Sequence, residues 1–425
     1  MPRIEPLRAL HFASTLRPEL DRLIAPPYDV ISEPQRQRLA QHPHNIVHVD
    51  LPVAGPGRDS YAEAARLLHS WCEEGVLQRD PRPTFPALEQ TYRTSSGALR
   101  TRRGLFARLR LETLDSGIVI PHERTLERPR ADRERLLAAT RTQLSPIFML
   151  HPDPSAEIAV LLRQVFAAPS THPIHDSDGH EMRLTAVEDE GVMSRLQHLL
   201  ARQWVLIADG HHRYESALQY REERRRAGAA DAEHALVFLC SLEDPGLSIF
   251  PIHRLVKALP DFRFDGVLQA LRPFFEVEAI DGGANLVAAV RAGSGRPGVF
   301  GLVGGSGGQG FLLRWREGAG LDRPGMRSIP AALQRLDVIL LHRLLFEEVL
   351  GIDADAQARG AHLEYVKDEA ELLARAATAQ LGVLLNPTRI EQVIEISRTG
   401  MRLPQKSTYF YPKVPTGLVL DPLDG

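Results

Sequence analysis

The spacing of apolar and polar positions changes several times along this chain, and each spacing predicts a different kind of element. Amphipathic helices are predicted where apolar residues recur every three or four positions, at 61–74, 131–143, 157–166 and 337–351. Strands are predicted where apolar residues alternate or run together, at 42–52, 181–189, 234–244 and 381–387. Two extended runs within 87–113 flank Ser95-Ser96-Gly97, which predicts a hairpin with its turn at these three residues.

One stretch combines both spacings. In WVLIADGHHRYESALQYREERRR, at 204–226, an apolar run ends at Asp209-Gly210 and a charged, helical pattern follows. This predicts a strand that turns directly into a helix beginning near His211. The charges at its end, including Glu222 three and four positions before Arg225 and Arg226, are typical of a solvated helix face.

Helices and strands are mixed along the chain and hairpins are present, which predicts an α+β or mixed α/β fold. With 425 residues, of which 43% are hydrophobic, the chain is long enough for two domains with cores of their own. We expect a catalytic α/β region at 1–255 and a second α/β region at 256–400. A C-terminal segment at 401–425 is expected to fold back on the site, because it holds three consecutive aromatic residues and ends in an apolar run.

Composition narrows the functional classes. The net charge of -3 does not favour a nucleic-acid-binding protein, and the apolar runs are too short to span a membrane. Cys72 and Cys240 are the only cysteines and form no paired motif, so we expect a reducing, cytoplasmic location. Lysine is scarce: the only four are Lys257, Lys367, Lys406 and Lys413. Lys406 and Lys413 lie close together near the C-terminus, which suggests that the chemistry of the protein needs an ammonium group there.

The turn at 209–213 has the features of an anion site. Gly210 permits a turn that other residues resist, and the start of the helix leaves N–H groups pointing outward at its positive end. Arg213 and the side chains of His211 and His212 can add donors to a phosphate, and Asp209 can hold a metal ion or accept a proton. An alternative stays open, in which Asp209 only caps the helix.

Two further segments carry candidate chemistry. In PHERT, at 121–125, Glu123 follows a predicted strand and can act as a general base, or it can pair with Arg124 or cap the next helix. In QKSTYFYPK, at 405–413, Lys406, Ser407 and Thr408 supply a cation and two hydroxyls to a phosphate, or the segment is a structural tail packed by its aromatic residues. The glycine-rich VGGSGGQG lies between two predicted strands, which favours a hairpin turn over a nucleotide-binding loop.

Four strings together resemble a known family. They are APPYDVIS at 25–32, PHERT with ATRTQLSPIF at 121–148, ADGHHRYESAL at 208–218, and PQKSTYFYPKVPTGLV at 404–419. In this order, over nearly the whole chain, they resemble the bacterial and archaeal family called domain of unknown function 1015.

The turn DGHHR is also similar to the nucleotide-binding turn of the ParB/sulfiredoxin-like fold, which implies a nucleotide- or phosphate-binding core with additional α/β elements. Sulfiredoxin has a cysteine where this chain has His211, and the partition proteins of this fold add a DNA-binding module that we do not find in the sequence. The remaining members are the free serine kinases. The similarity of this turn to that of the free serine kinases implies catalytic roles for Asp209 and His212. It also implies a general base elsewhere in the chain, for which Glu123 is the candidate.

The resemblance implies that this protein transfers a phosphoryl group to a small molecule, plausibly free L-serine, from pyrophosphate, ADP or ATP. Mg²⁺ is the expected cofactor, held partly by Asp209 and partly by the phosphates. Two alternatives remain open: a regulatory or partner-binding protein that binds a nucleotide at the same turn without fast chemistry, and a phosphate-ester hydrolase.

Overall fold

The computed structural model describes residues 1–55, 57–94, 97–123, 125, 127–167, 173–305, 308–404 and 406–423, and of residues 128 and 358 only the backbone. The predicted turn residues Ser95 and Ser96, and Arg124 as a partner of Glu123, lie outside the described part of the chain.

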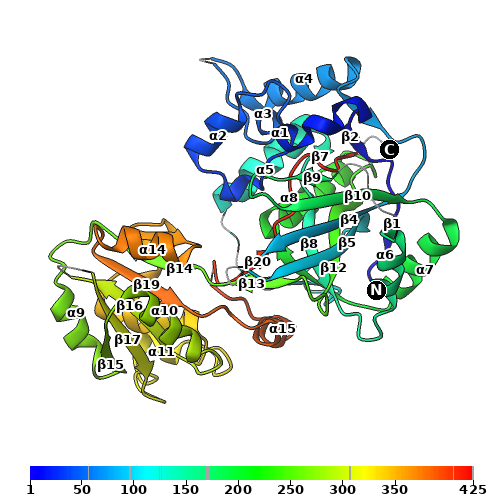
Figure 1. Cartoon of the computed structure of the whole chain (residues 1–425). Helices are drawn as coiled ribbons and strands as arrows, with labels where there is room; N and C mark the ends of the chain where they lie inside the picture. Colours follow the sequence, from blue (N-terminus) through cyan, green and yellow to red (C-terminus); the bar gives the residue numbers. More distant parts are fainter. Residues whose placement is uncertain are drawn as a thin grey trace. The chain divides into compact units, whose positions relative to one another are not determined.

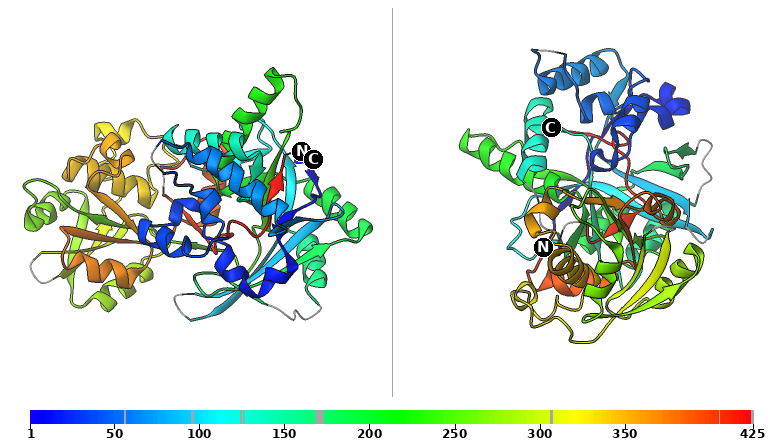
Figure 2. Two further views of the ribbon diagram at one scale, coloured as in Figure 1. Left: turned by 90° about the horizontal axis from the view of Figure 1, so that it is seen from above. Right: turned by 90° about the vertical axis from the view of Figure 1, so that its left-hand side faces the viewer.

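The chain is divided into two compact units (Figure 1). Unit 1 contains Met1–Ser248 and Phe410–Gly425, and unit 2 contains Ile249–Tyr409. Both ends of the chain therefore belong to unit 1 (Figure 2). The chain leaves unit 1 through the short strand β13 (Ser248–Phe250) and returns to it through β20 (Tyr409–Tyr411).

A mixed sheet forms the centre of unit 1. Its strands, in spatial order, are β6 (Val119–Pro121), β11 (Val205–Asp209), β8 (Ile147–His151), β12 (His234–Ser241), β5 (Leu99–Arg110), β4 (Phe85–Arg93), β10 (Glu181–Val187) and β9 (Ile174–His175). The two-residue strand β1 (Ile4–Glu5) pairs with β5 as a ninth member. Two neighbouring pairs, β6 with β11 and β8 with β12, are parallel, and the other pairs are antiparallel. The fold is thus mixed α/β, as the sequence predicts.

Side chains alternate between the two faces of this sheet, as the period of a strand requires. On one face Leu105, Ala107 and Leu109 of β5 join a continuous apolar core. Helices that contribute to this core are α6 (Glu157–Val165), α7 (Glu190–Leu200) and α8 (His211–Arg226). The helix α5 (Glu127–Thr140) packs against α8.

The chain end completes unit 1. Leu418, Val419 and Leu420 are almost fully buried, and the backbone of Leu420 bonds to that of Leu10 in both directions. Nε and Nη2 of Arg108 donate three hydrogen bonds to the carboxylate of Asp421 at 2.6–2.9 Å. The strand β21 (Asp421–Pro422) pairs with β7 (Thr142–Gln143). The strand β2 (Leu10–Phe12) pairs with β3 (Leu77–Arg79). An isolated bridge between Leu10 and Leu420 links β2 to the residue before β21.

Short helices precede the sheet in sequence. These are α1 (Leu20–Leu23), α2 (Glu33–Leu39), α3 (Val47–Asp50) and α4 (Ser60–Glu73). The strand predicted at 42–52 is wrong, because the backbone forms α3 there. Asn45 explains the difference: its side chain accepts a hydrogen bond from the amide of Val47 at 2.9 Å and donates to the carbonyls of Arg22 and Ile24. A side chain that satisfies backbone groups in this way favours a helix start over an extended strand.

Unit 2 is built around an antiparallel sheet. Its strands, in spatial order, are β15 (Phe275–Ile280), β17 (Gln309–Trp315), β16 (Val299–Gly304), β19 (Leu381–Leu385), β14 (His253–Val256) and β18 (Leu363–Val366). The helices around it are α9 (Phe264–Leu271), α10 (Gly283–Ala292), α11 (Pro324–Arg327), α12 (Asp337–Leu340), α13 (Ala354–Ala358), α14 (Glu369–Ala376) and α15 (Ile390–Arg398). The helix predicted at 337–351 begins as α12 but continues as a π-helix, Leu341–Val349, whose wider turns keep Leu341, Leu344 and Leu345 buried.

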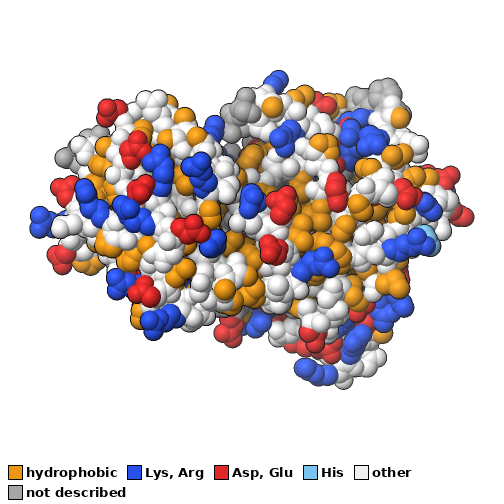
Figure 3. Space-filling model, turned by 90° about the horizontal axis from the view of Figure 1, so that it is seen from below, with side chains coloured by type: hydrophobic (Ala, Val, Ile, Leu, Met, Phe, Trp, Pro, Cys, Tyr) orange, Lys and Arg blue, Asp and Glu red, His pale blue; other side chains and the backbone are white. Residues whose placement is uncertain are grey.

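Charge is distributed without a dominant field. On the face of the molecule in Figure 3, basic and acidic side chains are interspersed rather than separated by sign. In the described ranges we find no helix with the length and apolar character that a membrane crossing demands.

Candidate functional site

Glu123 and Asp209 lie at the same edge of the unit 1 sheet. The strands β6 and β11 are parallel neighbours, with Pro121 opposite Ile207, and each candidate residue follows its strand position by two residues. Ends of parallel strands meet at one edge, which is where ligands bind in many α/β proteins. The pairing of β11 with β8 is irregular between Ile207 and Asp209, and such a bulge redirects the side chain at the end of the strand.

The turn between strand and helix depends on Gly210. This residue is the N-cap of α8 and has a left-handed backbone with a φ of 93°. A Cβ atom at this position would lie 3.0 Å from the guanidinium of Arg213, so the absence of a side chain lets Arg213 lie against the turn. Gly210 rather than Asp209 is therefore the N-cap residue of α8, and the cap position has no side chain. The first N–H groups of α8 have no acceptor within the helix and lie at its positive end.

Asp209 is held between two cations. Its Oδ2 accepts a hydrogen bond from Nη2 of Arg213 at 2.5 Å, and its Oδ1 contacts the Nζ of Lys413. The exposed fractions of the three side chains are only 11–13%, so water screens these charges weakly. The other end of the Arg213 guanidinium donates to the hydroxyl of Ser145 at 2.6 Å and to the carbonyl of Pro146. Arg213 is thus anchored within unit 1, and a contact with a bound phosphate stays a prediction.

Two histidines connect Asp209 to Glu123. The backbone N–H of His122 donates to Nε2 of His211 at 3.2 Å, which requires an unprotonated Nε2 and places the ring proton on Nδ1. Burial, with the charge of His122 second, lowers the pKa of His211 to about 3, so this ring is neutral near pH 7. The carboxylates of Glu123 and Asp209 act in the opposite direction and raise the pKa of this ring, but their effect is smaller than that of burial.

His122 has a defined orientation of its own. Its Nδ1 donates to the carbonyl of Ile207 at 2.7 Å, and its Nε2 lies 3.6 Å from Oε1 of Glu123. The ring packs edge-on against His211 and against Phe410 of the returning chain, with centroid distances of 4.6 and 5.6 Å. His212 is half-buried on the next position of α8 and also acts electrostatically on His211.

The three other residues predicted to bind the phosphoryl donor, Lys406, Ser407 and Thr408, belong to unit 2. Ser407 and Thr408 are buried, and the hydroxyl of Ser407 donates to the carbonyl of Pro404 at 2.6 Å. The backbone carbonyl of Lys406 accepts a bond from Arg254 at 3.1 Å. The placement of Lys406, Ser407 and Thr408 over donor phosphates stays a prediction.

Sequence reasoning did not identify Lys413 or His122. For Lys413 a signal exists, because lysine is scarce and two of the four lie in this segment; the side chain that reaches Asp209 is the second of the two. For His122 the sequence contains no such signal, since its role depends on a contact with His211, 89 residues later in the chain.

A metal at Asp209 is not favoured by the protein's own side chains. Both carboxylate oxygens face cationic groups, and within the described ranges no three His, Cys, Asp or Glu side chains gather as a metal site would require. Mg²⁺ commonly binds proteins through one or two carboxylates together with substrate phosphates. A Mg²⁺ ion at this turn would therefore have to arrive with the phosphates of a donor.

A family model described as "protein of unknown function (DUF1015)" matches residues 4–339, which is most of the chain. The chain belongs to the DUF1015 family. A search of curated proteins finds no match to this DUF1015 protein.

Among solved structures, the DUF1015 protein is similar to a mutant free serine kinase in complex with AMP, with 13% identity, a TM-score of 0.37, and coverage of 74% of this chain and 92% of the other. It is also similar to a conserved hypothetical protein from Pyrococcus furiosus, with 14% identity, a TM-score of 0.35, and coverage of 74% and 94%. A third structure is C-terminally truncated SbnI from Staphylococcus aureus, with 10% identity, a TM-score of 0.35, and coverage of 75% and 87%. With TM-scores this low, we base no argument about this chain on these similarities.

Proposed function

We propose that this protein is a small-molecule phosphotransferase that phosphorylates free L-serine, with pyrophosphate as donor or, alternatively, ADP or ATP. One observation carries the proposal: a carboxylate that can act as base, Glu123, lies at the same sheet edge as the start of α8 and the Asp209–Lys413 pair. A phosphotransferase needs these parts together, because its chemistry consists largely of positioning and charge stabilisation.

In the proposed reaction, backbone N–H groups at the positive end of α8 bind the phosphates of the donor. Glu123 accepts the proton of the acceptor hydroxyl, whose oxygen then bonds to the terminal phosphorus. The bond from that phosphorus to the bridging oxygen breaks, and inorganic phosphate leaves if the donor is pyrophosphate. Lys413 contributes positive charge beside the developing negative charge. Neutral His211 keeps Nδ1–H as a donor and adds no charge of its own. Mg²⁺, if it arrives with the donor, supplies further charge neutralisation.

One observation favours the second candidate, a nucleotide-binding regulatory protein without fast chemistry. Asp209 already pairs with both Arg213 and Lys413, which holds the turn in place without a substrate and suits binding without chemistry. The third candidate, a phosphate-ester hydrolase, would use the same base to activate water instead of a hydroxyl group.

The test is incubation of the protein with Mg²⁺, L-serine and, in separate reactions, pyrophosphate, ADP and ATP, followed by mass spectrometry for phosphoserine. Phosphoserine in one reaction, lost in Asp209→Asn and Glu123→Gln, supports the phosphotransferase. Release of phosphate without serine would instead identify a hydrolase. Binding of a donor without any product would favour the regulatory protein.

A further inference from the structure

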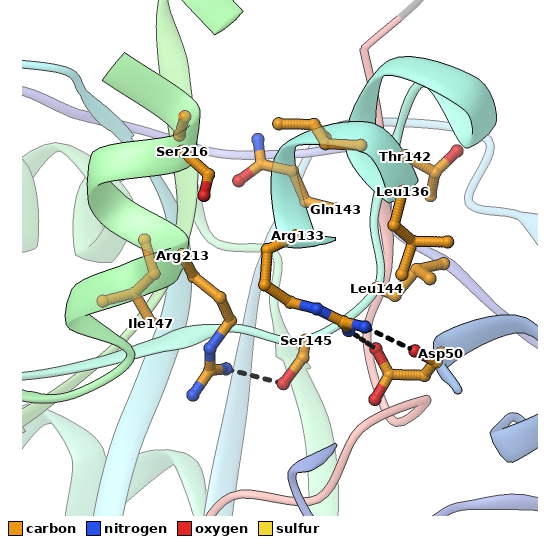
Figure 4. A pocket seen from close by; sticks show the side chains of 12 residues that line it. Asp50, Arg133, Leu136, Thr142, Gln143, Leu144, Ser145, Ile147, Arg213 and Ser216 are labelled. Atoms are coloured by element: carbon orange, nitrogen blue, oxygen red, sulfur yellow. Dashed lines mark hydrogen bonds and ion pairs between the residues drawn. The ribbon is translucent and has the colours of Figure 1, made fainter. Parts of the chain in front are cut away.

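A second recess of unit 1 begins where Arg213 is anchored. It is a cavity of about 50 Å³ between α5, α8 and the segment that leads into β8 (Figure 4). Asp50 and Arg133 line one side, and Arg213 with Ser145 lines the other. Arg213 therefore contacts Asp209 with one nitrogen and borders this cavity with the same guanidinium.

Two residues that line the cavity, Asp50 and Arg213, each have one buried polar side-chain atom with no partner among the described residues. Oδ1 of Asp50 accepts a bond from Nη1 of Arg133 at 2.9 Å, but Oδ2 of Asp50 is buried and accepts none. Nε of Arg213 is likewise buried and donates to nothing. Buried polar groups are nearly always hydrogen-bonded, and a charged group left unpaired is costly. An unsatisfied acceptor and an unsatisfied donor on two residues that line one cavity suit a ligand that carries both a cationic donor and an anionic acceptor.

The hydroxyl of Ser145 adds a second donor to the Arg213 side. Its oxygen accepts the bond from Nη1 of Arg213, so its own proton is available for another acceptor. The rest of the wall is largely apolar, including Leu144 and Ile147. A phosphate could accept from Arg213 and Ser145, but it would leave Oδ2 of Asp50 without a donor. A zwitterion supplies both an acceptor and a donor.

The volume of the cavity limits the size of this ligand. One water needs roughly 10–15 Å³ on this measure and has a share of about 30 Å³ in the liquid. A cavity of about 50 Å³ thus has room for roughly four waters, or about 100 Å³ of ligand. This is the size of an α-amino acid with a side chain of one or two heavy atoms.

We infer that this cavity binds a small α-amino acid, whose ammonium donates to Oδ2 of Asp50 and whose carboxylate accepts from Nε of Arg213 and the hydroxyl of Ser145. The inference deepens the proposed function and rests on it for one point, that the bound amino acid is the phosphoryl acceptor. Since Arg213 joins the cavity to Asp209, the side chain of the amino acid would face the turn at which the donor binds.

The first experiment uses the unmodified full chain and chemical variants of the ligand. Calorimetry without any donor should show binding of L-serine, glycine and L-alanine. Affinity should fall by about tenfold or more for N-acetyl-L-serine, which lacks the ammonium, and for L-serinamide, which lacks the carboxylate. L-Leucine should bind more weakly than L-alanine, because its side chain exceeds the cavity. Equal binding of L-serine and N-acetyl-L-serine would overturn the inference.

The second experiment tests Asp50 against a matched residue. Asp50→Asn removes the charge at the cavity, and Asp421→Asn removes the charge of another buried aspartate that pairs with an arginine, Arg108, away from the cavity. L-Serine binding should be lost in the first variant and kept in the second, while binding of pyrophosphate should be kept in both. If Asp50→Asn weakens pyrophosphate binding rather than serine binding, the cavity holds phosphate and the inference is wrong. If Asp50→Asn does not fold, the ligand series above decides the matter alone.

The two proposals can fail separately. Ammonium-dependent serine binding without phosphoserine formation would keep the cavity assignment and remove the phosphotransferase. Phosphoserine formation with an unchanged KM for serine in Asp50→Asn would keep the phosphotransferase and remove the cavity assignment.

Discussion

The ammonium of Lys413 contacts the carboxylate of Asp209, which lies 204 residues earlier in the chain. This contact brings the returning segment of unit 1 to the turn that begins α8. Replacing Lys413 by methionine should lower turnover by about 10²-fold, the scale of one lost electrostatic group at a reaction centre. The free energy of unfolding should fall by less than the ~3–5 kcal/mol typical of breaking a buried ion pair, because Arg213 still compensates Asp209.

Lys257→Met is the matched control for that change. Like Lys413, Lys257 pairs with a carboxylate, that of Glu364, but Lys257 is half exposed and belongs to unit 2. A turnover assay and a melting curve on both variants are sufficient. Full turnover in Lys413→Met would show that the pair with Asp209 is structural.

Glu123→Gln should lower turnover by about 10²–10⁴-fold if Glu123 is the general base, since this is the usual contribution of such a group. The melting temperature should stay nearly constant, because the amide keeps the size of the side chain. Glu215→Gln is the control. Glu215 lies one helical turn into α8, where its carboxylate accepts a hydrogen bond from Thr125 at 2.6 Å. A loss of turnover in Glu123→Gln no larger than that in Glu215→Gln would assign the base elsewhere.

Gly210→Ala should impair both stability and turnover. A left-handed backbone costs a residue with a side chain about 1–2 kcal/mol, and here the new methyl group would also meet the guanidinium of Arg213 at 3.0 Å. Gly228→Ala separates the two effects, because Gly228 has a φ of 78° but no atoms within 4 Å of the added carbon. Equal losses of stability and equal turnover in both variants would refute the role assigned to the Gly210–Arg213 contact.

Asp337 makes unit 2 sensitive to pH. Burial raises the pKa of this carboxyl from 3.8 to about 6, although the amide of Gly298 donates to it at 2.7 Å. The folded state therefore binds its proton more tightly than the unfolded state does. The contribution of Asp337 to the free energy of unfolding is greatest below pH 4, where the carboxyl is protonated in both states. It falls by up to about 3 kcal/mol as the pH rises through about 6.

The neutral variant Asp337→Asn should accordingly stabilise unit 2 at pH 8 and change little at pH 4. Hydrogen exchange of peptides from β16, which follows Gly298, measures this directly. Asp353→Asn serves as control, because Asp353 is an exposed helix cap and asparagine caps about as well. Stabilisation of equal size at both pH values would contradict the raised pKa of Asp337.

Local patterns predicted the elements that position the site. The strand ending at Asp209, the turn at Gly210 and the helix beginning at His211 follow from apolar spacing and one glycine, and the structure confirms all three. The helix at 61–74 is confirmed within one residue at each end, as α4. Each of these elements is decided by contacts between near neighbours in sequence, which is the information that periodicity carries.

The rest depends on contacts that spacing cannot reveal. Asp209 could be mistaken for a helix cap because its pairing with Lys413 links distant segments. Glu123 and Asp209 meet only because β6 and β11 are neighbours, an arrangement that no local pattern specifies. Asp50 lies in the segment predicted as a strand, and its burial against Arg133 depends on the packing of α3 and α5.

The division of unit 1 into two stretches of sequence sets an order of events during synthesis. Residues up to Ser248 leave the ribosome first, yet the strand partner of Leu10 and the counter-charge of Arg108 lie beyond Phe410. Unit 2 is continuous in sequence and can fold as soon as it emerges, whereas unit 1 must wait with part of its interior uncovered. The same segment that closes unit 1 carries Lys413 to Asp209, so a nascent chain cannot assemble the proposed reaction centre before translation has passed its last lysine.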